Sequence, residues 1–263
     1  MTGFLIDLDG TMYSGTRPLE HAAEFIETLQ KRNIPYLFVT NNSSRRPEEV
    51  AEHLQRITRI QASHEDVYTS SQTAARFIAD QNQGKRVYMI GERGLELALK
   101  EAGLELIKEG DGDIPDFVVS GIDREFTYSK LETAVGYILS GARYILTNPD
   151  HLLPNERGYS PGAGSLGGAI RTATQTEPVI IGKPSPIIME YAIEKMGLPA
   201  KDIWVVGDNL RTDICGGAAA GCRTALVRTG VAATHDIDAA VHQLGIKPDQ
   251  ICDHLMELTR LLP

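Results

Sequence analysis

Two aspartates near the start of the chain are spaced so that they could act together. Asp7 and Asp9 follow the apolar run "GFLI" and precede a glycine in "DLDGT". Because alternate residues of a strand point to the same face, the two carboxylates would project together. Asp-Gly between apolar stretches is also a strong hairpin signal, so the pair alone does not distinguish a reaction centre from an acidic turn.

Three further polar residues stand at the ends of apolar runs. They are Thr40 after "YLFV", Lys183 after "PVIIG" and Asp208 after "IWVVG". Each has an ordinary structural interpretation by itself: Thr40 as a β-branched strand residue, Lys183 as a solvated lysine and Asp208 as a helix cap. Their coincidence with Asp7, each beside an apolar strand, is much less probable than any one of them.

The elements that must position these residues alternate between strands and helices. Strands are predicted at residues 3–6, 34–40, 178–181, 203–207 and 224–227, and helices at 22–30, from Pro47 onward, at 186–197 and around Ala218. Apolar strands alternating with amphipathic helices imply an α/β fold with a doubly wound, Rossmann-like parallel sheet covered on both faces. In such sheets ligands bind at the carboxyl ends of the strands, where the polar residues would meet.

The middle of the chain has an alternation of its own. Strand-like runs such as "RVYMIG" and "DFVVSG" are separated by helical patterns, and the segment is entered through "DQNQGK" and left through "TATQTEP". These polar boundaries predict an α/β domain inserted at residues 81–177 into a core domain formed by residues 1–80 and 178–263.

Composition excludes several classes of function. The 263-residue chain has 42% apolar residues, and 35 acidic against 26 basic residues give a net charge of −9. This balance argues against a broad surface for nucleic acid or anionic membranes. The three cysteines form no Cys-x-x-Cys pair, so neither a disulfide framework nor a zinc site is expected. No apolar run resembles a signal peptide or a membrane span, which leads us to expect a cytoplasmic protein.

Phosphoryl transfer is the chemistry that requires these residues. Asp7 would attack phosphorus and form an aspartyl phosphate, and Asp9 would protonate the leaving oxygen and later deprotonate the attacking water. A cation must bridge carboxylates and phosphate, which repel each other, and Mg²⁺ fits because it takes a few carboxylates together with substrate oxygens and waters. The predicted metal site comprises Asp7, the backbone carbonyl of Asp9 and Asp208, with Asp213 supporting it.

The other polar residues fit the phosphoryl group. Lys183 would supply a fixed positive charge for the phosphoryl oxygens and for the Asp7 carboxylate. Thr40 and the backbone N–H of Asn41 would donate hydrogen bonds, and Asn42 belongs to the same predicted phosphate-binding segment.

Four stretches in this order resemble the motifs of a known family. "DLDGT", "FVTNN", "IIGKP" and "GDNLRTD" are similar to the four motifs of the haloacid dehalogenase superfamily, and in particular of its NagD-like phosphatases. The resemblance implies the same roles as the chemistry above: a nucleophile at Asp7, an acid/base at Asp9, and phosphate contacts and a magnesium site at the remaining motif residues. Asp9 further indicates a phosphatase, because dehalogenases of this superfamily lack the second acid.

The resemblance extends into the inserted domain. "TNPDHLLPN" and "PGAGSLGGAI" are similar to the large, C2-type cap of the NagD-like branch. A cap of this kind implies substrate contacts at Asn148, Asp150 and His151, and pairing of two copies through the cap. "GAGSLG" also fits the G-x-G-x-x-G pattern of dinucleotide-binding sites, but no buried strand precedes it, so no such cofactor is expected.

The function expected from the sequence is therefore a Mg²⁺-dependent phosphatase. Its substrates would be small-molecule phosphate monoesters, such as nucleoside monophosphates or sugar and other metabolite phosphates, with no nucleic acid or membrane partner. Two alternatives remain: a phosphotransferase that uses the same chemistry, and a non-catalytic protein that binds phosphorylated ligands.

Overall fold

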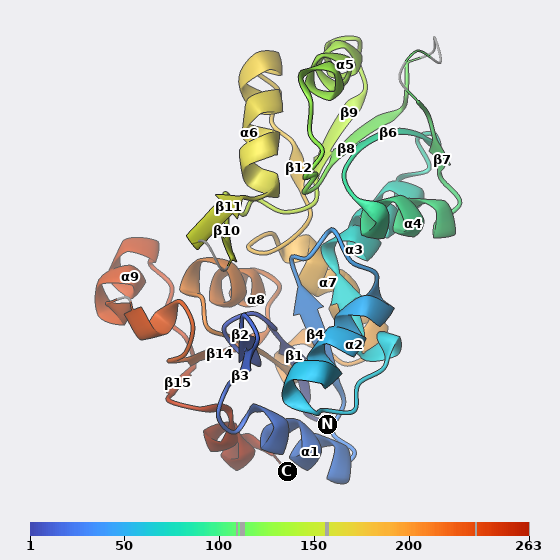
Figure 1. Cartoon of the computed structure of the whole chain (residues 1–263). Helices are drawn as coiled ribbons and strands as arrows, with labels where there is room; N and C mark the ends of the chain where they lie inside the picture. The colour runs from blue at the N-terminus through green and yellow to red at the C-terminus, as the bar shows by residue number, and fades with distance from the viewer. Residues whose placement is uncertain (109, 111–113, 156–157, 235, 263) are drawn as a thin grey trace. The chain divides into compact units, whose positions relative to one another are not determined.

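The computed structural model describes residues 1–108, 110, 114–155, 158–234 and 236–262. The chain divides into two compact units (Figure 1). The first unit consists of Met1–Thr40, Pro47–Tyr68 and Lys183–Pro263, and the second consists of Asn41–Arg46 and Thr69–Gly182.

The first unit is built on a six-stranded parallel sheet in the order β15-β14-β13-β1-β4-β5. Its strands are β1 Gly3–Ile6, β4 Tyr36–Thr40, β5 Val67–Thr69, β13 Ile203–Gly207, β14 Arg223–Val227 and β15 Gln250–Cys252. From β1 the chain first builds outward through β4 and β5, and later through β13, β14 and β15 on the other side. The predicted doubly wound α/β core is thus confirmed, with its switch point at β1.

Both faces of this sheet are covered, which explains why its strands are apolar throughout. Phe4 of β1 packs with Phe25 of helix α1 on one face, whereas Leu5 packs with Ile188 of helix α7 on the other. The helices of this unit are α1 Ala22–Lys31, α2 Pro47–Thr58, α7 Pro186–Met196, α8 Cys215–Ala219 and α9 Ile237–Leu244. A short antiparallel pair, β2 Tyr13–Ser14 and β3 Arg17–Pro18, completes the unit.

Helix α7 illustrates how the local sequence sets an element boundary. The Ser185 side chain accepts a hydrogen bond from the N–H of Ile187, and Pro186 occupies the first helical position, where a missing N–H costs nothing. The helix ends at Gly197, whose φ of 71° suits glycine. These signals start the helix three residues after Lys183.

The second unit contains a five-stranded parallel sheet in the order β12-β9-β8-β6-β7. Its strands are β6 Arg86–Ile90, β7 Glu105–Leu106, β8 Phe117–Ser120, β9 Arg143–Leu146 and β12 Val179–Ile180, with a separate antiparallel pair, β10 Leu152–Asn155 and β11 Gly158–Pro161. Its helices are α3 Ser70–Gln81, α4 Arg93–Glu101, α5 Tyr128–Leu139 and α6 Ala163–Thr174. Residues of α5 and α6 pack with Tyr88, Val118 and Tyr144 on one face of the sheet.

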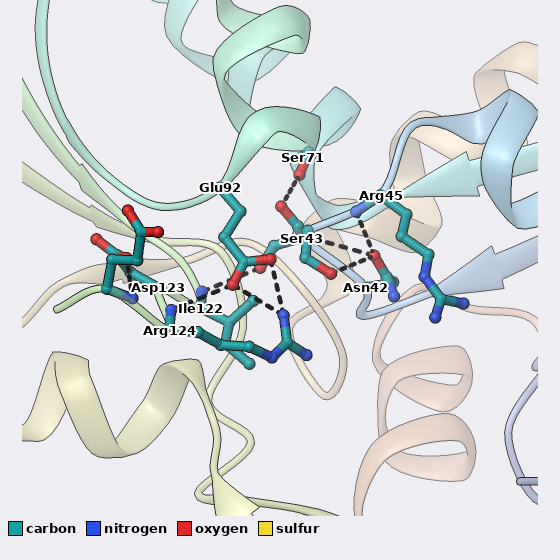
Figure 2. A network of polar contacts seen from close by, with 10 residues as sticks. Asn42, Ser43, Arg45, Ser71, Glu92, Ile122, Asp123 and Arg124 are labelled. Atoms are coloured by element: carbon teal, nitrogen blue, oxygen red, sulfur yellow. Dashed lines mark hydrogen bonds and ion pairs between the residues drawn. The ribbon is translucent and has the colours of Figure 1, made fainter.

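The loop Asn41–Arg46 is held within the second unit by polar contacts (Figure 2). The Ser71 hydroxyl donates to the Ser43 carbonyl at 2.9 Å, and the N–H of Ile122 donates to the Ser43 hydroxyl at 3.2 Å. The Asn42 side chain accepts the N–H groups of Ser44 and Arg45, which closes the turn. These contacts explain why a segment that follows strand β4 of the first unit folds with the second.

The two units differ at their edges from the domains expected from sequence. Helix α3 lies in the second unit, although the polar stretch that suggested a boundary begins only near its end. The strand predicted at 178–181 is β12, which pairs with β9 of the second sheet instead of joining the first. Packing of α3 against α4 and pairing of β12 with β9 decide the two assignments, and neither boundary is marked by composition.

The glycine-rich stretch "GAGSLG" forms the start of helix α6. A Cβ atom on Gly164 would lie 2.1 Å from the carbonyl oxygen of Pro149, so glycine permits a close approach of two backbone segments there. This close approach gives the glycine at position 164 a structural role. In the described part of the chain, no helix combines the length and the apolarity that crossing a bilayer requires.

Candidate active site

The central strands of the first sheet end in polar residues. Asp7 directly follows β1, Asp208 directly follows β13, and Thr40 is the last residue of β4. The N–H of Asp7 donates to the carbonyl of Val206 at 2.9 Å, so β1 and β13 remain paired up to the aspartates that follow them. Because β13, β1 and β4 are neighbours in the parallel sheet, the residues at their ends lie at the same edge of it, as the sequence predicts.

Lys183 is the centre of the polar contacts in this unit. Its ammonium donates to Oδ1 of Asp7 at 2.5 Å, to Oδ1 of Asp213 at 2.7 Å and to the carbonyl of Val39 at 3.1 Å. A lysine ammonium has three N–H donors, and each finds an acceptor here. With only 3% of its side chain exposed, Lys183 is a fixed charge and not a solvated lysine.

Asp213 is positioned by a π-helical turn, Leu210–Ile214, that follows β13. While one of its oxygens accepts from Lys183, the other accepts from the N–H of Asn209 at 3.2 Å. Both carboxylate oxygens are therefore engaged in holding the lysine and the turn. That Asp213 also supports a magnesium site stays a prediction.

Three carboxylates surround one lysine. Asp7, Asp208 and Asp213 each offer an oxygen, and these oxygens lie within 4.8 Å of one another. Burial is the main cause that raises the pKa of Asp7 well above its usual value, and the charges of Asp213 and Asp208 raise it further against the opposing effect of Lys183. Burial and the Asp213 charge likewise raise the pKa of Asp208 to about 7.

The lysine itself stays charged. Burial by itself would lower the pKa of Lys183, but the carboxylates of Asp213 and Asp7 outweigh it, and the pKa lies above its usual value. One ammonium faces three carboxylates, so ionising all three leaves an excess of negative charge that a divalent cation would balance. The donors are hard oxygens, which suit Mg²⁺. Lys183 donates to Oδ1 of Asp7, and the N–H of Val231 donates to Oδ2 of Asp208. The candidate ligand atoms are therefore Oδ2 of Asp7 and Oδ1 of Asp208.

Among the residues that the structure describes, this carboxylate group contains Asp7, Asp208 and Asp213 but not Asp9. The side chain of Asp9 is exposed, two residues beyond Asp7. The hairpin formed by β2 and β3 has residues 15 and 16 in its loop, so Asp9-Gly10 is not the hairpin turn that the dipeptide suggested. An exposed carboxylate beside a buried one suits a group that exchanges protons with solvent and substrate.

The remaining predicted residues belong to the second unit, and hydrogen bonds join three of them, Asn41, Asn148 and Asp150. The Asn148 amide donates to the carbonyl of Asn41 at 2.8 Å, and the Ser70 hydroxyl donates to the same oxygen at 2.8 Å. The Asn41 amide donates to the Asp150 carboxylate at 3.1 Å. Asn148 and Asp150 therefore hold Asn41, whereas the side chain of His151 is exposed.

Sequence reasoning missed the loop after β14. Its Val231 N–H donates to Oδ2 of Asp208 at 2.6 Å, and the Thr229 hydroxyl donates to the carbonyl of Gly10 at 2.6 Å. Gly207 was missed too, although a Cβ atom there would lie 2.2 Å from Cγ of Asp213. The only sequence signal for the loop is a Thr-Gly pair just beyond an apolar strand, where such sheets place ligand-binding loops.

Replacing Gly207 with alanine is expected to lower turnover by about 100-fold, since the added methyl group must displace Asp213 and, with it, Lys183. Steady-state assays and thermal unfolding of the variant measure this effect. Gly136→Ala is the matched control, because apart from its chain neighbours and the backbone of helix α5 no atom lies within 4 Å of its Cβ position. Equal activity of the two variants would show that the position of Asp213 is unimportant.

Comparisons with known proteins identify the family of this chain. A family model described as haloacid dehalogenase-like hydrolase matches residues 4–105, and a second, HAD-hydrolase-like model matches residues 180–258. The 5'-nucleotidase YutF of Bacillus subtilis is 47% identical over 92% of this chain and 94% of its own length. The acid sugar phosphatase of Staphylococcus saprophyticus is 44% identical over 89% of each chain.

A solved structure extends the likeness to three dimensions. The glycerol phosphate phosphatase of Mycobacterium tuberculosis, crystallised in complex with magnesium, superposes with a TM-score of 0.89 at 38% identity, covering 98% of this chain and 76% of that one. The similarity thus spans both units and includes all four motif segments. The chain belongs to the haloacid dehalogenase-like hydrolases.

Proposed function

We propose that the protein is a Mg²⁺-dependent phosphatase that hydrolyses small-molecule phosphate monoesters through an aspartyl phosphate. The observation that carries the proposal is the buried Lys183, which joins Asp7 to Asp213 beside the Asp208 carboxylate. A cationic anchor next to a carboxylate nucleophile suits attack on an anionic phosphoryl group. The phosphatase names of the relatives support the same reaction class.

The reaction consists of two displacements at phosphorus. In the first, a carboxylate oxygen of Asp7 bonds to phosphorus while the bond to the leaving oxygen breaks, and Asp9 gives its proton to the leaving alkoxide. In the second, Asp9 takes a proton from water, whose oxygen bonds to phosphorus as the Asp7–phosphorus bond breaks. Inorganic phosphate and the free Asp7 carboxylate result, and Asp9 ends protonated as it began.

The magnesium site is proposed at Asp7, the backbone carbonyl of Asp9 and Asp208. When bound, the ion would offset the repulsion between carboxylates and phosphate. Lys183 holds Asp7 in place, and Thr40 and the N–H of Asn41 are proposed to donate to the phosphoryl oxygens. Asn42, which closes the turn after Asn41, contributes by keeping that segment in shape.

Magnesium affinity is expected to rise about tenfold between pH 6 and pH 8. The metal-free Asp208 has a pKa raised to about 7, so it is mostly protonated at pH 6 and mostly ionised at pH 8. Only the ionised form binds the cation, and therefore binding strengthens as pH rises through 7. Titration calorimetry at the two pH values measures the change, and equal affinities would contradict the predicted pKa shift.

A panel of phosphomonoesters tests the proposed activity. We expect phosphate release from at least one of the nucleoside monophosphates, sugar phosphates and glycerol phosphates, and none after magnesium is chelated. Transfer of the phosphoryl group to an added alcohol without net hydrolysis would instead indicate a phosphotransferase. Binding of phosphorylated ligands without turnover would indicate a non-catalytic binding protein.

We propose that the second unit is the cap that selects the substrate and that His151 contacts the substrate. His151→Ala is expected to change KM values and the ranking of substrates in the panel while the magnesium requirement persists. His242→Ala in helix α9 of the first unit is the matched control. An unchanged ranking would remove His151 from the substrate site.

A further inference from the structure

The loop that follows strand β14 contacts two segments of the first unit that are far apart in sequence. The Thr229 hydroxyl donates to the carbonyl oxygen of Gly10 at 2.6 Å. Two residues later, the N–H of Val231 donates to Oδ2 of Asp208, also at 2.6 Å. We call residues Thr229–Val231 the clamp, because its first residue binds the turn after Asp9 and its last residue binds the carboxylate after β13.

Gly10 is fixed on both of its peptide groups. Its N–H donates to the carbonyl of Tyr13 at 2.7 Å, and its carbonyl accepts from Thr229. In a trans peptide the N–H and the preceding carbonyl point in opposite directions, so the bond to Tyr13 sets the direction of the Asp9 carbonyl. Its φ of 89°, together with a Cβ position only 2.2 Å from Oδ2 of Asp208, restricts this site to glycine.

The middle residue of the clamp brings the two segments together. A Cβ atom on Gly230 would lie 2.0 Å from Oδ2 of Asp208 and 2.6 Å from Cα of Gly10. The absence of a side chain is therefore what allows the loop, the Gly10 turn and the carboxylate to meet. A backbone N–H at Val231 and a hydroxyl at Thr229 then fix the contact from either side.

We infer that the clamp is a positioning element that sets the distance between the Asp9 carbonyl and the Asp208 carboxylate, and thereby the affinity for magnesium. The inference rests on the proposed function, which assigns both groups to the metal site. Mg²⁺ demands near-ideal octahedral geometry, so a small displacement of one ligand weakens binding. Thr229 touches neither metal nor substrate in this account and acts only through Gly10.

The test compares Thr229→Val, which removes the hydroxyl at nearly constant shape, with Thr229→Ser, which keeps it. Magnesium dissociation constants of the full chain, measured by titration calorimetry, are expected to rise about 3- to 10-fold in Thr229→Val and to stay close to wild type in Thr229→Ser. Thr259→Val is the matched control, since it removes a hydroxyl bond of 2.7 Å to a backbone carbonyl, that of Met256, in the C-terminal turn Leu255–Leu261. If Thr229→Val does not fold, Thr229→Ala serves in its place.

The outcomes separate this inference from the proposed function. Wild-type affinity in Thr229→Val, or equal weakening in Thr229→Ser or Thr259→Val, would overturn the clamp while the magnesium site stands. A wild-type protein that releases phosphate but binds no magnesium would overturn the metal site and the clamp with it. Weakening confined to the variants that lack the Thr229 hydroxyl would support the clamp.

Discussion

Replacing Asp7 with asparagine is expected to lower phosphate release on the order of 10⁴- to 10⁶-fold, because the amide cannot form the covalent bond to phosphorus. Folding should be preserved. Burial and the neighbouring Asp213 and Asp208 charges already disfavour ionised Asp7, so a neutral side chain of equal size removes repulsion along with the pairing to Lys183. Assays with saturating substrate and a thermal unfolding curve measure both effects.

Asp238→Asn is the control for the Asp7 substitution, since Asp238 is exposed in helix α9. It should retain wild-type turnover. Substantial turnover by Asp7→Asn would exclude Asp7 as the nucleophile, and a large fall in its melting temperature would show that the carboxylate is needed for folding instead.

Replacing Lys183 with methionine is expected to affect both folding and turnover. The variant leaves the carboxylates of Asp7 and Asp213 without their shared cation, and breaking a buried ion pair in this way costs about 3–5 kcal/mol of unfolding free energy. Turnover should fall about 10²- to 10³-fold, because a fixed positive charge near the phosphoryl group is lost. Chemical denaturation and steady-state kinetics test the two effects separately.

The stability loss in Lys183→Met should depend on pH. Without the lysine, the pKa of Asp7 rises further above its value in the unfolded chain, so this group stabilises the variant at low pH and loses that contribution as pH rises. The difference in unfolding free energy from wild type is therefore expected to be larger at pH 8 than at pH 5. Lys201→Met, at an exposed lysine of the same unit, is the control. A pH-independent difference would mean that lost packing, and not orphaned charge, explains the effect.

Much of the site can be predicted from the sequence because its residues stand directly at the ends of apolar strands. Apolar strands end at Asp7, Thr40 and Asp208, and parallel strands place their carboxyl ends together. Where Lys183 reaches depends on the tertiary fold, but its place just beyond the apolar run "PVIIG" made it a candidate. The alternation of strands and helices was enough to predict the doubly wound sheet.

The parts that could not be predicted depend on contacts between distant segments. Nothing local to Thr229 indicates that its hydroxyl binds the carbonyl of Gly10, 219 residues away. The same holds for Asn148, whose amide binds the carbonyl of Asn41, and for strand β12, whose pairing with β9 places it in the second unit. Composition marks loops and linkers, whereas hydrogen bonding decides which unit each segment joins.

In the proposed mechanism Asp7 carries the phosphoryl group, and this can be examined by trapping the phosphoenzyme. Wild-type protein mixed with a labelled phosphomonoester and magnesium is quenched in acid during turnover, and the labelled peptide is identified by mass spectrometry. We predict a hydroxylamine-sensitive label on Asp7 that is absent from Asp7→Asn. Rapid turnover with no label, or a label on another residue, would exclude Asp7 as the phosphoryl carrier.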